Sequence, residues 1–226
     1  MKQLVELEMK KLNMNYIRRM GLLSSSVLLV YLIIVSMLSK GKEVDLLHFY
    51  NQVIAYNKII YTLFIAALIN RMFSEEMVTK SISILFTYPI SRMKLLSAKI
   101  ILIMFISIPY MMGSMIIHLT FITLLNLIFS IFEGTLTAGI IVGILVSACL
   151  QCILAVLTAF IILYIDVRFV STRLTLIVAG TLAFFLYTFS GNSIFGMGIL
   201  LTLVTAVVGV VMIHKSLSLV ANKDIM

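Results

Sequence analysis

Few side chains in this 226-residue sequence could carry out chemistry, and they do not form a recognised catalytic pattern. Cys149 and Cys152 have the C-x-x-C spacing of redox pairs, but they lie within one apolar run without a second pair of ligands, so we interpret them as packing residues. His48, His118 and His214 are scattered along the chain. The sequence contains no H-E-x-x-H, G-x-S-x-G or phosphate-binding G-x-x-x-x-G-K-[ST] pattern. We therefore predict that the chain is not an enzyme and holds no metal or cofactor of its own.

The polar segment 74–99 is the most informative part of the chain, because it interrupts an otherwise apolar sequence. Ser74 is suited to cap a helix, and the acidic Glu75 and Glu76 suit the positive end of that helix. Pro89 disfavours helical geometry at Tyr88 and ends the helix. The segment is therefore predicted to form a short helix followed by a sharp break.

A second helix is predicted to begin after this break, with Ser91 as its cap and Arg92 as its first residue. The first helix is amphipathic, because apolar side chains recur on one face at helical spacing. These residues are Val78, Ile82, Leu85 and Phe86. Such a helix can simply cover a membrane boundary, or it can dock against a soluble partner and transmit the motion of that partner.

Composition places the chain in a membrane. It is 62% hydrophobic and 12% charged, whereas a soluble domain is about 45–50% apolar and about 25% charged. The net charge of +8 could suggest nucleic acid, but the basic residues are spread over short loops, where they act as topology signals. We predict an integral protein of the lipid bilayer with no nucleic-acid partner.

The fold class predicted from these patterns is an all-α membrane protein with about six transmembrane helices. Each crossing needs about 20 apolar residues. A single transmembrane domain, 1–226, is predicted to contain spans 20–38, 53–70, 100–125, 136–165, 174–189 and 194–213. Residues 1–19 are predicted to form an interfacial helix, because Leu4, Met9, Leu12 and Tyr16 can share one apolar side. Residues 74–92 of the polar segment lie between the second and third spans.

The distribution of positive charge predicts the orientation. Fourteen of the 17 Lys and Arg residues fall in the amino-terminal segment, in segment 71–99, after the fourth span or in the tail. Positive loops mark the cytoplasmic side, so a multi-pass protein of the cell membrane with both termini in the cytoplasm is expected. Lys58 lies inside the second span and is predicted to extend toward the outer surface. Asp166 and Arg168 are predicted to occupy a solvated inner turn, where they could make a second docking contact.

The fourth span carries small and polar residues at a spacing of four, which lets helix backbones approach closely in lipid. They include Gly139, Gly143, Ser147 and Gln151. This pattern can serve packing within one subunit, or it can form a subunit interface or the wall of a translocation pathway, with Gln151 as a polar contact.

The polar segment resembles the signature of ABC-2 type transporter permeases. Glu76 matches the acidic position of that signature, residues 85–92 (LFTYPISR) contain its P-I-S-R, and Lys99 matches its closing lysine. The family often has Gly-Thr where this chain has residues 80–81 (Lys-Ser), and Gly where it has Ala98. The resemblance implies that segment 74–92 is a cytoplasmic coupling helix. The residues implied in contact with an ATPase are Glu76, Leu85, Phe86, Tyr88, Pro89, Ser91, Arg92 and Lys99.

The same resemblance implies a function and partners. The chain would be the permease subunit of an ATP-driven ABC exporter and would pair with a second permease, identical or a sibling. A cytosolic ABC ATPase dimer would bind ATP and Mg²⁺. Small permeases of this type resemble exporters of bacteriocins, lantibiotics, bacitracin and phenol-soluble modulins, and the apolar spans favour an amphipathic or hydrophobic substrate, such as a peptide.

Two alternatives have other requirements. A non-transporting membrane scaffold or immunity protein would share the ABC-2 pattern but not the ATPase. An intramembrane protease is suggested by Glu75, Glu76 and Lys80, which resemble the E-E-x-x-x-R of CAAX-type proteases. That family has Arg at the last position, and His118 has Ser114 where an aromatic residue is expected. The exporter permease is therefore the favoured interpretation.

Overall fold

The apolar runs form long helices in the computed structural model, which describes residues 2–38, 46–78, 92–129, 138–190, 204–205 and 207–216. All regular structure in these ranges is helical, so the predicted all-α membrane fold is confirmed. The helices are α1 (Lys2–Lys11), α2 (Met14–Leu38), α3 (Leu46–Met72), α4 (Ser74–Val78), α6 (Arg92–Phe129), α7 (Ala138–Phe169), α8 (Thr172–Ser190) and an unlabelled helix, Val207–Ser216.

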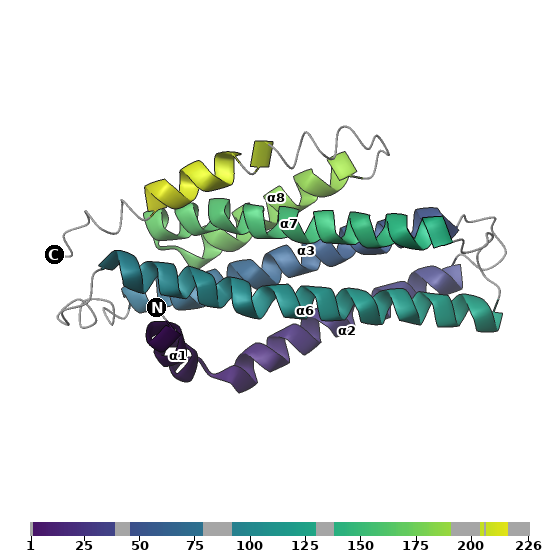
Figure 1. Ribbon diagram of the computed structural model, residues 1–226, viewed down its shortest axis with the longest axis horizontal. Helices are drawn as coiled ribbons and strands as arrows, with labels where there is room; N and C mark the ends of the chain where they lie inside the picture. Colours follow the sequence, from purple (N-terminus) through teal and green to yellow (C-terminus); the bar gives the residue numbers. More distant parts are fainter. Residues whose placement is uncertain are drawn as a thin grey trace.

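The long helices run side by side as a bundle, and α1 lies across one end of it (Figure 1). We call this the α1 end; α3 finishes there and α6 begins there. Four described helical stretches are long and apolar enough to cross a membrane: Met14–Leu38, Leu46–Val78, Lys94–Phe129 and Ile141–Phe169. Thr172–Phe185 and Val207–Ser216 are shorter apolar helices that overlap the fifth and sixth predicted spans, so the number of crossings stays a prediction.

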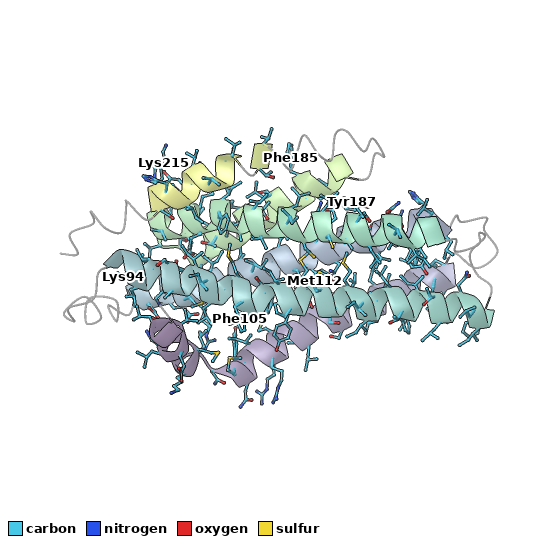
Figure 2. The ribbon with its side chains drawn as sticks, viewed as in Figure 1. Lys94, Phe105, Met112, Phe185, Tyr187 and Lys215 are labelled. Atoms are coloured by element: carbon cyan, nitrogen blue, oxygen red, sulfur yellow. The ribbon has the colours of Figure 1, made fainter. Side chains whose placement is uncertain are left out.

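Helix α3 is the centre of the bundle. It packs against α2, α6, α7 and α8. In its most apolar stretch 67% of residues are buried, against 22–39% in the other three long stretches, so among these four described helices α3 alone is enclosed by protein. The outer helices instead expose large apolar side chains such as Phe105 and Phe185, which lie on opposite sides of the bundle (Figure 2). Such surfaces are suited to lipid.

The enclosure of α3 corrects the interpretation of Lys58. Its side chain does not extend to a surface, because the residue is 0% exposed within the bundle. Hydropathy along a sequence indicates how deep a residue lies, but it does not indicate which side of the helix is covered by neighbours. Since α3 has helices on most of its sides, Lys58 is covered by its neighbours.

The amino-terminal segment breaks earlier than the sequence suggested. Helix α1 ends at Lys11 and α2 begins at Met14, before the expected start of the first span. Asn13 supplies the reason, because its side-chain oxygen accepts a hydrogen bond from the Tyr16 backbone amide at 3.3 Å. This is the contact of a helix cap, and it separates α1 from α2.

A close approach between α2 and α6 depends on Gly21. A Cβ atom at this position would lie 2.5 Å from the Tyr110 ring. We expect Gly21→Val to lower the free energy of unfolding by about 1–3 kcal/mol, because the added atoms must displace that ring. Gly113→Val is the matched control, since apart from the nearby backbone of α6 itself no described atom lies within 4 Å of a Cβ placed there. Thermal unfolding in detergent measures both; equal shifts would contradict the close packing.

Candidate functional site

Lys99 lies at the centre of a group of charges at the α1 end of the bundle. Its ammonium group is 3.1 Å from the Glu8 carboxylate of α1 and 2.6 Å from the Glu76 carboxylate of α4. It also donates to the Met72 carbonyl at 3.2 Å, where α3 passes into α4. The Lys99 side chain is 1% exposed. One buried cation therefore joins α1, α4 and α6.

Lys11 completes this group, which we call the inner charge cluster: Glu8, Lys11, Glu76 and Lys99. The Lys11 ammonium lies 2.6 Å from Glu76 on the oxygen that Lys99 does not use. Its side chain is 44% exposed, so the cluster reaches from the buried interior to the surface. Two carboxylates face two ammonium groups. A buried charge is tolerated when it is paired in this way, and removing one partner is strongly destabilising.

Local sequence explains how the cluster is assembled. Leu4, Glu8 and Leu12 follow one another at a spacing of four, so Glu8 lies on the apolar face of α1 and is carried inward. Glu76 is in α4, which continues closely from α3 because the Phe73 amide donates to the Ile69 carbonyl at 2.9 Å. Sequence reasoning missed both residues that α1 contributes to the cluster. A carboxylate on an apolar helix face is the signal that could have indicated Glu8.

The structure places the predicted coupling residues unevenly. Glu76 and Lys99 are brought together, and they bind each other and α1. Arg92 begins α6, as the sequence suggested. The remaining predicted coupling residues lie outside the described part of the chain: Leu85, Phe86, Tyr88, Pro89 and Ser91.

A second group of polar side chains lies on the other side of α4. We call it the carboxylate latch: Ser74, Asp166 and Thr175. The Ser74 and Thr175 hydroxyls both donate to Asp166 Oδ1, at 2.8 Å and 2.6 Å. Asp166 is 0% exposed, which corrects the prediction of a solvated turn. Arg168 is exposed, and it donates to the Tyr164 hydroxyl at 3.1 Å.

Polar contacts also link the long apolar helices to one another. The Ser114 hydroxyl donates to the Asn57 side-chain oxygen at 2.8 Å and joins α6 to α3. His118 Nε2 lies 3.1 Å from the Ser25 carbonyl of α2. Tyr187 of α8 bonds Tyr56 of α3 through their hydroxyls at 3.1 Å. These contacts explain how polar side chains are accommodated in the bundle, because buried polar groups need partners.

The small residues of α7 fall into two halves. Gly139 and Gly143 are exposed, and apart from the nearby backbone of α7 itself no described atom lies within 4 Å of a Cβ placed on either. Ser147 donates to the Ile144 carbonyl of its own helix, at 2.8 Å. The side-chain oxygen of Gln151 is buried without a hydrogen-bond partner among the described residues. Gly139 and Gly143 are therefore not used for packing against the described helices.

The two cysteines do not form a pair. Cys149 is exposed and Cys152 is buried, and both are free. The Cys152 sulfur lies 3.2 Å from the Met112 sulfur of α6. The described residues contain no group of three His, Cys, Asp or Glu side chains that could hold a metal ion. The polar groups that connect separate segments at the α1 end are thus the strongest candidates for a functional site.

Comparison with known families agrees with this arrangement. The family model described as ABC-2 family transporter protein matches residues 4–191, a range that includes both polar groups at the α1 end. No match was found among curated proteins or among solved structures. The family match covers most of the chain, and the helices have the length and apolar composition of membrane spans. The chain therefore belongs to the ABC-2 transporter family, as a membrane permease of an ABC transporter.

Proposed function

We propose that this permease forms the translocation pathway of an ATP-driven exporter, together with a second permease that is identical or a sibling. A separate cytosolic ABC ATPase dimer would supply the energy by hydrolysing ATP with Mg²⁺. The α1 end would face the cytoplasm, with both termini there. Exposed basic residues at that end, such as Lys94 and Lys215 (Figure 2), support this orientation in the cell membrane.

The observation that carries the proposal is the bridge made by Lys99. Glu76 belongs to the first turns of the proposed coupling segment, 74–92, and Lys99 belongs to the helix that follows it. Separating these charges would take one of its two charged partners from each of them, and Lys99 is fully buried, so the contact resists opening. A movement imposed on α4 by an ATPase is then passed to α6, and through Glu8 to α1.

The proposed cargo is amphipathic or hydrophobic, with a peptide as the favoured class. A pathway formed with a second permease would be framed by the Leu, Ile, Met and Phe side chains that make up most of the spans. A small pocket between α3, α6 and α7 is also apolar, with Ser107 as its polar lining residue. Such surfaces suit apolar groups and offer little to a simple hydrated ion.

Two substitutions in the coupling segment test the proposal. We expect Pro89→Ala and Arg92→Glu to leave membrane insertion intact but to separate ATP hydrolysis from transport. Pro89→Ala removes the predicted break between the docking helix and the span, and Arg92→Glu reverses a charge at the predicted contact. The measurement uses vesicles that contain the permease and its ATPase, with a fluorescent amphipathic peptide as the probe.

The outcomes separate the candidate functions. ATP-dependent peptide accumulation that falls in both variants while ATP hydrolysis continues supports coupling through this segment. Normal accumulation in both variants contradicts it. A permease that purifies without any ATPase, and does not alter ATPase activity after reconstitution, favours the non-transporting scaffold or immunity protein.

A further inference from the structure

The carboxylate latch connects α4 to a part of the bundle that the inner charge cluster does not touch. Ser74 is the first residue of α4, Asp166 is in the last turn of α7, and Thr175 is in the first turn of α8. All three are at least 98% buried, with exposed fractions of 2%, 0% and 1%. Lys99 ties α4 to α1 and α6. The latch ties the same short helix to α7 and α8.

The turn that carries the latch is unfavourable in two respects. Val170, between α7 and α8, has a φ of 48°. A β-branched residue in this left-handed region is strained, and such positions persist where surrounding contacts impose them. The Val170 amide donates to the Asp166 carbonyl at 2.8 Å, so the strained residue ends α7 directly beside the latch.

The Asp166 carboxylate is the second unfavourable feature. Its Oδ1 accepts both hydroxyl bonds, while Oδ2 is buried without a hydrogen-bond partner among the described residues. A buried polar atom in this state costs stability. Both costs are borne at the turn between α7 and α8, so surrounding contacts, the latch among them, hold this turn in place.

We propose that the carboxylate latch is a second coupling contact, through which movement of α4 reaches α7 and α8. This proposal rests on the proposed function, because it requires that an ATPase moves α4. It adds Asp166 as a positioning residue that passes this movement on to α7 and α8. The α4 helix then acts on both sides of the bundle at once. The inner charge cluster carries motion to α1 and α6, and the latch carries it to α7 and α8.

The test places one reporter on each route, at the end of the bundle opposite α1. Gly139→Cys reports on α7, and Leu127→Cys, where the native residue is 80% exposed, reports on α6. Both are made in a chain that carries Cys149→Ala and Cys152→Ala. The permease and its ATPase are reconstituted in vesicles, and labelling by a membrane-impermeant maleimide is timed with and without ATP and vanadate.

In the parent chain, both labelling rates are expected to change on addition of ATP and vanadate. With Asp166→Ala, the response at position 139 should fall by about fivefold or more, while the response at position 127 is kept. Asp166→Asn retains an acceptor oxygen for the two hydroxyls, so it should restore most of the response at position 139. A loss of protein stability alone would not distinguish the two reporters.

A second variant covers the case in which Asp166→Ala does not fold. Thr175→Val removes one of the two hydroxyl bonds to Asp166, together with the contact of the same hydroxyl with the Ser171 carbonyl at 3.0 Å, and should reduce the response at position 139 in the same direction. Thr158→Val is its matched control, because Thr158 is 1% exposed but donates to the Ala155 carbonyl of its own helix at 2.8 Å.

Three results would overturn the proposal. Equal losses at both reporters in the Asp166 and Thr175 variants would assign the latch a general structural role, and unchanged responses at both would assign it none. Neither result would affect the proposed function, because the parent chain would still respond to ATP. An absence of any ATP response in the parent chain would instead contradict the proposed function, and the latch proposal with it.

Discussion

Lys99→Gln, which removes the charge at the centre of the inner charge cluster, is expected to lower the free energy of unfolding by about 3–5 kcal/mol. The ammonium group lies between Glu8 and Glu76, so its removal leaves two carboxylates at the same buried place. Lys11 is too exposed to compensate Glu8. We also expect ATP hydrolysis in the complex with the ATPase to continue without export, because α6 is no longer joined to α4.

Lys94→Gln is the matched control for this prediction. Lys94 precedes Lys99 on the same helix, and it is exposed, so its loss should change stability by no more than about 0.5 kcal/mol. Denaturant unfolding in detergent measures both variants. The double variant Glu8→Gln with Lys99→Gln should recover part of the lost stability, because the effects of two substitutions in one charge network do not simply add. Similar losses for Lys94→Gln and Lys99→Gln would remove the basis for the cluster.

Glu76→Lys is expected to have the largest effect of all, namely the loss of most folded protein from the membrane. The substitution replaces the carboxylate shared by two ammonium groups with a third ammonium group. Two like charges about 4 Å apart repel by about 4 kcal/mol at an effective dielectric constant of about 20. This is a substantial fraction of the stability of a typical folded domain.

The neighbouring Glu75 provides the control for charge reversal. It occupies the same first turn of α4, but it is exposed and is not part of the inner charge cluster. Because contacts of exposed charges contribute little to stability, Glu75→Lys should yield nearly normal amounts of folded protein. Size-exclusion chromatography of detergent-solubilised protein measures the yield, and hydrogen exchange in α1 measures whether that helix stays attached. Equal yields for the two reversals would mean that Glu76 has no special role in the fold.

The sequence predicted one half of the inner charge cluster and missed the other. Glu76 and Lys99 were identified because they match positions in a family signature. Glu8 is 91 residues from Lys99, and Lys11 is 65 residues from Glu76. No local pattern relates segments so far apart. Their meeting depends on the Asn13 cap, which ends α1 early and lets it lie across the bundle.

The sequence also did not reveal which side chains of a helix are covered by its neighbours. The membrane class, the polar segment and the start of α6 followed from hydropathy, charge and helix-ending residues. Lys58 and Asp166 were placed toward solvent because each is charged, yet both are 0% exposed. Lys58 is enclosed because α3 is central, and Asp166 because Ser74 and Thr175 fold over it. Both outcomes depend on tertiary contacts.

The central position of α3 has a consequence for how the protein is made. Its span has a mean hydropathy of 1.6, against 2.3 to 2.5 for the other three long spans. Asn57, Lys58, Thr62 and Asn70 account for much of this difference, and each of them is buried against protein. A helix with such residues is poorly suited to lipid on its own. Since α3 is synthesised before α6, α7 and α8, the nascent chain carries a weakly membrane-compatible helix until its later neighbours emerge, and biogenesis must shelter α3 during that interval.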